Sequence, residues 1–269
     1  FGKWILGSSI LVFFLNQGDD ILVGKLLGAT MLGFYQMAYR ISNMPATEIT
    51  HVISQVTFPA YSKLQDNIPK LREAYLKTLQ LTAFISIPLA GGIFILAPDF
   101  TKIFLGEQWM PMVPAMQVLA LWGLSRSIAA TTGPLFNGIG KPRINIWLQL
   151  AKLILIAIFI YPLTMLWDIT GTALAVAAAA LCIDPVCVYL VAKILQCKAW
   201  DTVKTILLPA ISTVIMLFCM TVLNKLTLGI TTLAIFLGYV VFGCGTYMLV
   251  IAVFDKSLVK QIYHSIKII

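Results

Sequence analysis

Charged residues are scarce in this sequence, and their scarcity excludes an ordinary soluble domain. Of its 269 residues, 11% are charged and 59% are hydrophobic, and the mean hydropathy is +0.92. Soluble domains carry about 25% charged residues. The composition therefore predicts an all-α, polytopic integral membrane protein, because a helix satisfies its own backbone hydrogen bonds inside a bilayer.

The sequence also lacks the motifs that mark common enzyme and cofactor sites. It contains no GxxxxGK[ST] phosphate loop, no HExxH and no GxSxG, which argues against a built-in ATPase, metalloprotease or α/β-hydrolase. The five cysteines form no CxxC pair, and the two histidines lie far apart, so neither a metal site nor a disulfide framework is indicated. We expect no catalytic residue, metal or cofactor, and we interpret the protein as not being an enzyme.

The net charge of +8 does not indicate nucleic-acid binding, because the basic residues lie in short connections between apolar segments. Twelve lie in one set of alternate connections and only three in the opposite set. The positive-inside rule places the richer set in the cytoplasm, with both ends of the chain. About eight segments are long enough to cross the cell membrane. They cover residues 3–28, 33–62, 74–98, 112–137, 144–167, 170–195, 203–224 and 229–254.

The first two spans carry charges inside apolar sequence. Asp19, Asp20 and Arg40 flank an expected hairpin turn at 28–33. A carboxylate inside a span costs at least a few kcal/mol, so it normally faces a bundle interior or an aqueous cavity. Two interpretations stay open, a structural Asp20–Arg40 ion pair and a charge that lines a transport cavity. The sequence does not decide whether Asp19 or Asp20 points inward.

Two later spans carry further intramembrane charges. Arg126 lies in the fourth span, either facing a cavity or packing and snorkelling. Lys152 shares a face of the fifth span with Asn145 and Gln149, and it either lines a cavity or reaches the interface. Asp184, just before a proline in the sixth span, is a weaker candidate.

The spacing of Leu71, Tyr75 and Leu79 predicts that the third span begins with an amphipathic turn at the cytoplasmic interface. The last two spans carry charge only near their ends. We therefore expect two units. Residues 1–198 form a six-helix transporter lobe, and residues 199–269 form two additional helices and a cytoplasmic tail.

Several runs of the sequence match a known family. They are DDILVGKLLGATMLGFYQMAYRISNMP, VTFPAYSKLQDN, LREAYLKTLQLTAFISIPLAGGIFILAPDFTKIFLGEQW and PLFNGIGKPR. With them the chain resembles the polysaccharide-exporter branch of the MOP flippase superfamily, of the colanic-acid type. These proteins are flippases of lipid-linked O-antigen and exopolysaccharide repeat units. The resemblance is specific over 1–143 and rests mainly on hydropathy beyond.

The resemblance implies two six-helix lobes that face a central cavity, often with two more helices. This chain looks like the second, C-terminal lobe plus the two extra helices. A start in mid-helix at Phe1 fits that reading, and we expect the chain to be a fragment. The N-terminal lobe is expected either elsewhere in the same polypeptide or in a partner chain, because alternating access needs both lobes.

The resemblance also implies a function in polysaccharide or lipopolysaccharide biosynthesis, the transport of polyprenyl-diphosphate-linked oligosaccharides across the cytoplasmic membrane. Buried cations would attract the diphosphate, amides would bind sugar hydroxyls, and Asp20 would exchange a proton or a sodium ion. The expected partners are this lipid-linked substrate and membrane lipid, with no nucleic acid. The cation candidates are Arg40, Arg126 and Lys152, and the amide candidates are Asn16, Gln17, Gln36 and Asn43.

Three other classes of function stay open at this point. A cation-coupled drug antiporter of the same superfamily would use Asp20 for a cationic substrate. A membrane-embedded glycosyltransferase or polymerase would be an enzyme, although no long extramembrane segment is present for such chemistry. A non-transporting membrane subunit is the third alternative.

Overall fold

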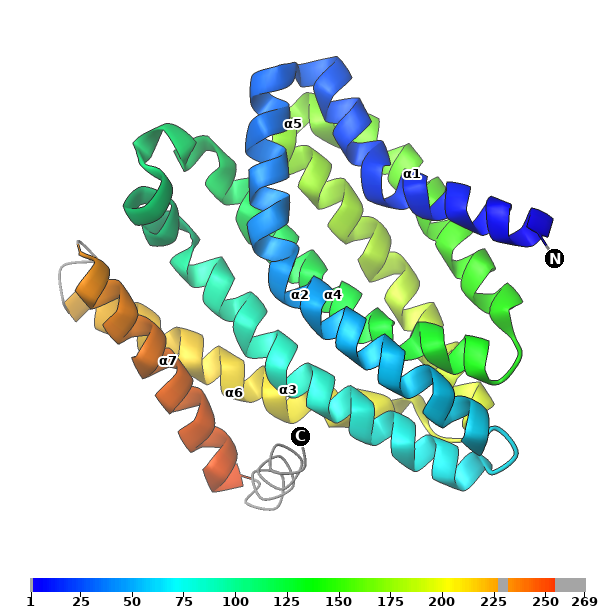
Figure 1. Ribbon diagram of the computed structural model, residues 1–269. Coiled ribbons are helices and arrows are strands. Elements are labelled where there is room, and N and C mark those ends of the chain that lie inside the picture. The colour runs from blue at the N-terminus through cyan, green and yellow to red at the C-terminus, as the bar shows by residue number, and fades with distance from the viewer. Residues whose placement is uncertain (1, 227–231, 255–269) are drawn as a thin grey trace.

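The computed structural model describes residues 2–226 and 232–254, and that part of the chain is helical with no strand (Figure 1). A π-helical turn at Thr101–Leu105 and a 3-10 helix at Glu107–Met112 connect the third and fourth α-helices. The α-helices in the described part are α1 (Gly2–Leu27), α2 (Ala29–Leu64), α3 (Ile68–Phe100), α4 (Val113–Gly138), α5 (Pro142–Ile194), α6 (Ala199–Leu226) and α7 (Leu233–Phe254).

Helix α5 contains two rods that fold back on each other. Trp167 and Asp168 leave the helical backbone region, and Asp168 takes a positive φ of 49°. The hydroxyl groups of Thr164 and Thr172 meet across this turn at 2.8 Å. Counting both rods, the structure confirms the eight expected helices, including the separate spans 144–167 and 170–195.

Four helical stretches of the described chain are long and apolar enough to cross a membrane by length and composition. They are Ile68–Leu105, Pro142–Ile194, Ala199–Lys225 and Leu233–Phe254. Because α5 turns back within its length, it provides two crossings. The chain is thus a multi-pass membrane protein. The tail expected after 254 lies outside the described residues.

The turn between α1 and α2 is tighter than the sequence predicted. Gly28 alone separates the two helices, with a φ of +85° that favours glycine, whereas Gly33 lies inside α2. The expected turn over 28–33 was too wide, because one glycine in this conformation reverses the chain.

Helix α3 begins earlier than the expected residue 74. The Asn67 side chain caps its first turn by accepting a hydrogen bond from the Lys70 N–H at 3.2 Å. Leu71, Tyr75 and Leu79 are fully or almost fully buried. They belong to a protein core cluster with residues of α2, α4 and α5, so the predicted interfacial face is an internal packing face.

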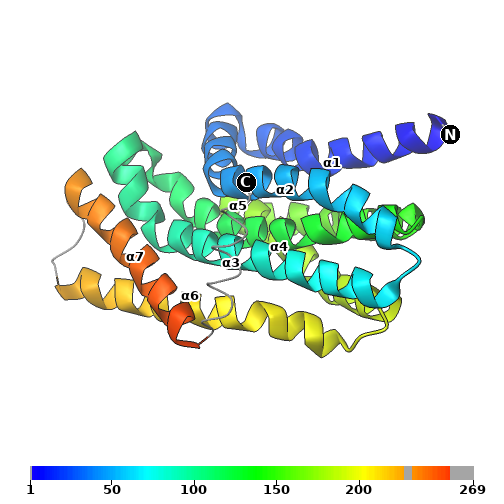
Figure 2. The ribbon, with the colours of Figure 1, turned by 60° about the horizontal axis from the view of Figure 1, so that its bottom comes forward.

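Helix α4 is the central element, since it packs against α2, α3 and α5. Helix α6 runs along α3, and α7 packs on α6 (Figure 2). The Tyr247 hydroxyl of α7 donates a hydrogen bond to the Phe84 carbonyl oxygen of α3 at 2.8 Å. Helices α6 and α7 therefore attach to the other helices mainly through α3. The division near residue 198 remains a prediction.

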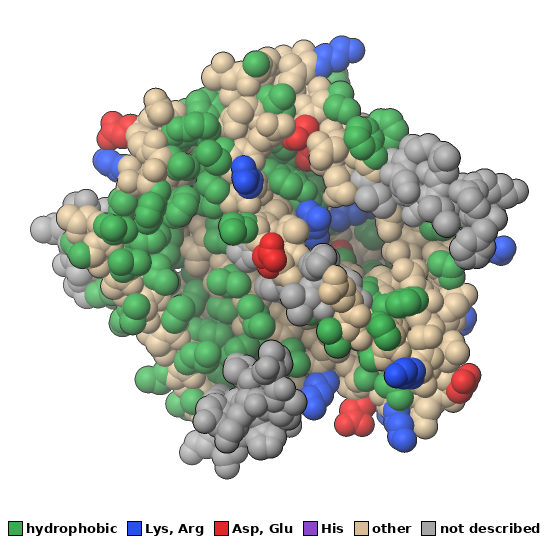
Figure 3. All heavy atoms as spheres, in the orientation of Figure 1, with side chains coloured by type: hydrophobic (Ala, Val, Ile, Leu, Met, Phe, Trp, Pro, Cys, Tyr) green, Lys and Arg blue, Asp and Glu red, His purple; other side chains and the backbone are tan. Residues whose placement is uncertain are grey.

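The connections alternate between two ends of the molecule. Those between α2 and α3, α4 and α5, and α5 and α6 lie at one end (Figure 1, lower right), and the α1–α2 and α3–α4 connections lie at the other. Hydrophobic side chains cover much of the face between the ends, while charged side chains gather at the lower right end (Figure 3). This arrangement is the one that a membrane protein requires.

Gly171 offers a test of the tight turn in α5. A Cβ there would collide with the backbone of Leu163, whereas a Cβ at Gly238 on α7 would meet nothing within 4 Å. Gly171→Ala should lower the free energy of unfolding by about 1–3 kcal/mol through overpacking. Gly238→Ala should be neutral or stabilising, because alanine favours helix more than glycine does. Thermal unfolding in detergent measures both, and equal melting temperatures would contradict the tight turn.

Candidate functional site

A cavity of about 330 Å³, with charged and amide side chains among apolar ones, lies between α1, α4 and both rods of α5. Three of the sequence-predicted site residues line it, namely Asn16 of α1, Arg126 of α4 and Lys152 of α5. Asp184, the weaker candidate, lines it as well. The structure thus collects charged groups from α4 and from both rods of α5 around one cavity, with an amide from α1.

Trp122 is the platform on which the two cations of this cavity lie. Its side chain is only 5% exposed, and it stands one helical turn before Arg126 on the same face of α4. The Arg126 guanidinium carbon lies 5.6 Å from the Trp122 ring centroid, and the Lys152 Nζ lies 5.7 Å from it. Cations above an indole face are attracted by its quadrupole, so one ring holds both charges close together.

The Arg126 guanidinium is fixed by a second aromatic residue. Its Nη1 donates a hydrogen bond to the Tyr39 hydroxyl of α2 at 2.9 Å. The Tyr39 and Trp122 rings are themselves in contact, with centroids 5.5 Å apart. The guanidinium group is planar. Because one of its nitrogens is fixed in this way, the other N–H groups keep a defined orientation toward the cavity.

Amide side chains surround the cations. Asn145 and Gln149 precede Lys152 on α5 at steps of four and three residues, and both line the cavity. The Gln149 Oε1 is buried and has no hydrogen-bond partner among the described residues. A buried acceptor without a donor is costly, so the site has an unused place for a hydroxyl or amide group of a ligand.

Asp184 supplies the negative charge of the cavity. Its Oδ2 accepts a hydrogen bond from the Ser125 hydroxyl of α4 at 2.5 Å. The carboxylate also interacts electrostatically with Lys152. The cavity therefore contains two basic side chains and one acidic side chain, an excess of positive charge that suits an anionic ligand.

The two neighbouring carboxylates of α1 have different surroundings. Asp19 is buried, and its Oδ2 accepts a hydrogen bond from the Tyr35 hydroxyl of α2 at 2.7 Å. Asp20 is half-buried and accepts from the Gln36 amide at 3.0 Å. Asp19 is therefore the inward-pointing member, a point that the sequence left undecided.

The other predicted site residues do not reach the cavity. Gln17, Gln36 and Arg40 are exposed on α1 and α2. Asn43 is buried, and its amide nitrogen donates to the Tyr39 carbonyl oxygen at 3.2 Å. Within the described ranges, the one ion pair closer than 4 Å joins Lys102 and Glu107, so the structure does not pair Asp20 with Arg40.

Sequence reasoning missed the residues that orient the charges. Tyr39, Trp122 and Ser125 each touch a charged residue of the site from α2 or α4. The only available signal was the four-residue step between Trp122 and Arg126 on one helix face. Contacts between residues that are far apart in the chain cannot be predicted from a single sequence.

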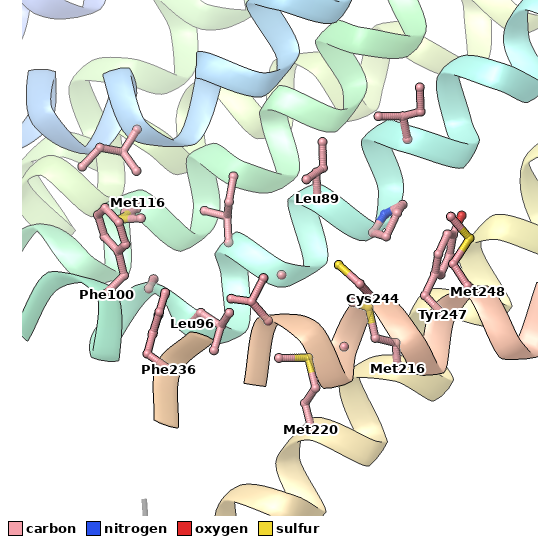
Figure 4. A pocket seen from close by; sticks show the side chains of 18 of the residues that line it. Leu89, Leu96, Phe100, Met116, Met216, Met220, Phe236, Cys244, Tyr247 and Met248 are labelled. Atoms are coloured by element: carbon pink, nitrogen blue, oxygen red, sulfur yellow. The ribbon is translucent and has the colours of Figure 1, made fainter. Parts of the chain in front are cut away.

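A second, apolar groove of about 470 Å³ separates α3 from α7, with α6 at its base (Figure 4). Its walls are hydrocarbon and thioether groups, including Leu89 and Leu96 of α3, Met216 of α6 and Met248 of α7. This composition suits a hydrocarbon chain and not a charged headgroup.

Comparison with known proteins gives this arrangement a context. Residues 1–114 match the family described as "Polysaccharide biosynthesis protein". The chain is 26% identical over 263 residues to an uncharacterized membrane protein in the cps region of Klebsiella pneumoniae, covering 97% of this chain and 54% of that protein. It is 31% identical over 146 residues to the lipopolysaccharide biosynthesis protein WzxC of Escherichia coli strain K12, covering 54% of this chain and 29% of that protein.

A solved structure is also similar. The lipid II flippase MurJ in its inward closed conformation superposes with a TM-score of 0.77 at 17% identity, covering 96% of this chain and 54% of MurJ. At that identity the likeness concerns the fold. The chain spans about half the length, or less, of these relatives. The predicted resemblance to membrane proteins of polysaccharide biosynthesis is confirmed, and the fold is similar to that of MurJ.

The difference in burial between Asp19 and Asp20 can be tested by removing the hydrogen-bond donor of each and measuring the loss of stability. Tyr35→Phe leaves a buried carboxylate without its donor, which should cost about 1–3 kcal/mol of stability. Gln36→Leu removes a bond at an exposed position and should change stability by about 0.5 kcal/mol or less. Thermal unfolding of the purified protein tests the pair, and a Tyr35→Phe variant as stable as the parent would refute the buried bond.

Proposed function

Because this chain is similar to polysaccharide flippases of the MOP superfamily, we propose that it forms part of a transporter of polyprenyl-diphosphate-linked oligosaccharides. The transporter serves polysaccharide or lipopolysaccharide biosynthesis in the cytoplasmic membrane. It moves its substrate without changing it chemically. The observation that carries the proposal is the pair of cations, Arg126 and Lys152, held on one tryptophan beside a cavity.

The diphosphate of such a substrate matches these two cations. Arginine presents planar N–H groups that fit phosphate oxygens, and lysine adds a point charge. Both cations lie within the helical bundle, where screening by salt is weaker than at the surface. A headgroup that bridges Arg126 and Lys152 would relieve the mutual repulsion of the two cations.

The sugar part of the substrate would extend along the amide groups of the cavity. Asn16, Asn145 and Gln149 can donate to and accept from hydroxyl groups, and the free Gln149 acceptor needs a donor. The four other candidates lie away from this cavity, so we propose that they contact the substrate only at another stage of transport. They are Gln17, Gln36, Arg40 and Asn43.

Transport would require a second lobe, since alternating access rocks one bundle against another around the substrate. The proposed arrangement makes this chain the C-terminal lobe with two extra helices, and the N-terminal lobe a part of the same polypeptide or a partner chain. The basic end of the bundle, with the α2–α3 and α5–α6 connections, faces the cytoplasm in this proposal.

Neutralising the cavity cations tests the proposal directly. Arg126→Gln and Lys152→Gln should each raise the half-saturating concentration of a polyprenyl-diphosphate oligosaccharide about tenfold or more, because each removes a charge-assisted bond to phosphate. Lys102→Gln is the control, since that lysine is 62% exposed and lies away from the cavity. Transport is measured with the intact protein in liposomes, and unchanged transport by both cavity variants would refute the proposed site.

Asp20 remains the proposed coupling residue, because it is half-buried on α1 and accepts a hydrogen bond from Gln36 of α2. Asp20→Asn should abolish the dependence of transport on an imposed proton or sodium gradient, whereas Asp20→Glu should retain it. The measurement compares initial rates in liposomes with and without each gradient. A gradient response that survives Asp20→Asn would remove this residue from the coupling mechanism.

A further inference from the structure

Asp184 has no place in the binding of an anion, yet it lies among the cations that would bind one. Its carboxylate and the Arg126 and Lys152 side chains line the same cavity. A carboxylate at an anion site weakens binding through like-charge repulsion. Its presence there calls for a role other than attraction of the substrate.

We infer that Asp184 is the internal counterion of the empty site, which the diphosphate replaces beside Lys152 during each transport cycle. This inference rests on the proposed function. Asp184 would thereby act as a positioning residue, which sets how tightly the cations hold a phosphate group and how readily they release it.

The contacts of Asp184 explain how it can fill this role. The Ser125 hydroxyl holds one carboxylate oxygen, Oδ2, at 2.5 Å, so the carboxylate is anchored to α4. Lys152 interacts electrostatically with both Asp184 and Arg126. The lysine thus lies in the field of one anion and one cation, and a bound phosphate would compete with Asp184 for it.

The charges of the site explain why Asp184 would weaken the binding of the diphosphate and favour its release. Without Asp184, the two cations on Trp122 would repel each other in a partly buried site, and a bound diphosphate would have no competitor. With Asp184, the empty site is partly neutralised and the bound state is less favoured. A transport site must bind well enough to load and weakly enough to release, which a built-in competitor achieves.

The test is Asp184→Asn, which keeps an oxygen for the Ser125 hydroxyl and removes the charge. Transport by the intact protein in liposomes should show a half-saturating substrate concentration about tenfold lower and a lower maximal rate, because release is slowed. Inorganic pyrophosphate, used as a competing probe, should inhibit the variant at about tenfold lower concentration. Asp184→Glu, which retains the charge, should behave like the parent.

Ser125→Ala is the matched control for a purely structural role. It removes the same hydrogen bond but leaves the charge of the carboxylate, so it should not reproduce the tenfold fall in half-saturating concentration. Asp184→Ser provides a second neutral variant if the asparagine variant does not accumulate in membranes, and the same fall in half-saturation is expected of it.

The outcomes separate this inference from the proposed function. An unchanged or increased half-saturating concentration in the neutral variants overturns the counterion role of Asp184. The proposed substrate site would still be supported if Arg126→Gln and Lys152→Gln weaken transport. If substituting the cations has no effect either, the proposed site itself fails. Equal changes in Asp184→Asn and Ser125→Ala would assign Asp184 to helix packing alone.

Discussion

The cost of placing charge inside a bilayer is the constraint on which this structure depends. Three charged groups between the described helices each have a hydrogen-bond partner on a neighbouring helix, and an unpartnered charge would be expensive in hydrocarbon. Tyr35 of α2 holds Asp19 of α1, Tyr39 of α2 holds Arg126 of α4, and Ser125 of α4 holds Asp184 of α5. These bonds run between helices, so the polar residues also select which helices lie side by side.

Close packing of α2 and α4 supports the same network. The Ser42 hydroxyl donates to the Met116 carbonyl oxygen at 2.7 Å. A Cβ on Gly123 would lie 3.3 Å from the Ser42 carbonyl oxygen, so a larger residue would push the helices apart. Trp122 is the neighbour of this glycine in α4. The approach of the two helices therefore also positions the ring that carries both cations.

The helices could be predicted from the sequence because their apolar lengths match a bilayer, and the separate spans 144–167 and 170–195 were visible on either side of Trp167 and Asp168. The site was only partly predictable. Charge inside an apolar span marked Arg126 and Lys152, but Arg40 carries the same signal and is exposed. The Ser125–Asp184 contact spans 59 residues, and a single sequence holds no information on such tertiary pairs.

The groove between α3 and α7 gives the molecule an uneven stiffness. Thioether side chains are unbranched and polarizable, so a wall rich in them changes shape with little loss of contact. The bundle around α4 is tied by hydrogen bonds with fixed geometry, whereas this seam depends mainly on adaptable packing. Helices α6 and α7 therefore form a compliant flank. A change in the spacing of α3 and α7 would therefore cost less contact than a change in the hydrogen-bonded helices that position Arg126 on Trp122.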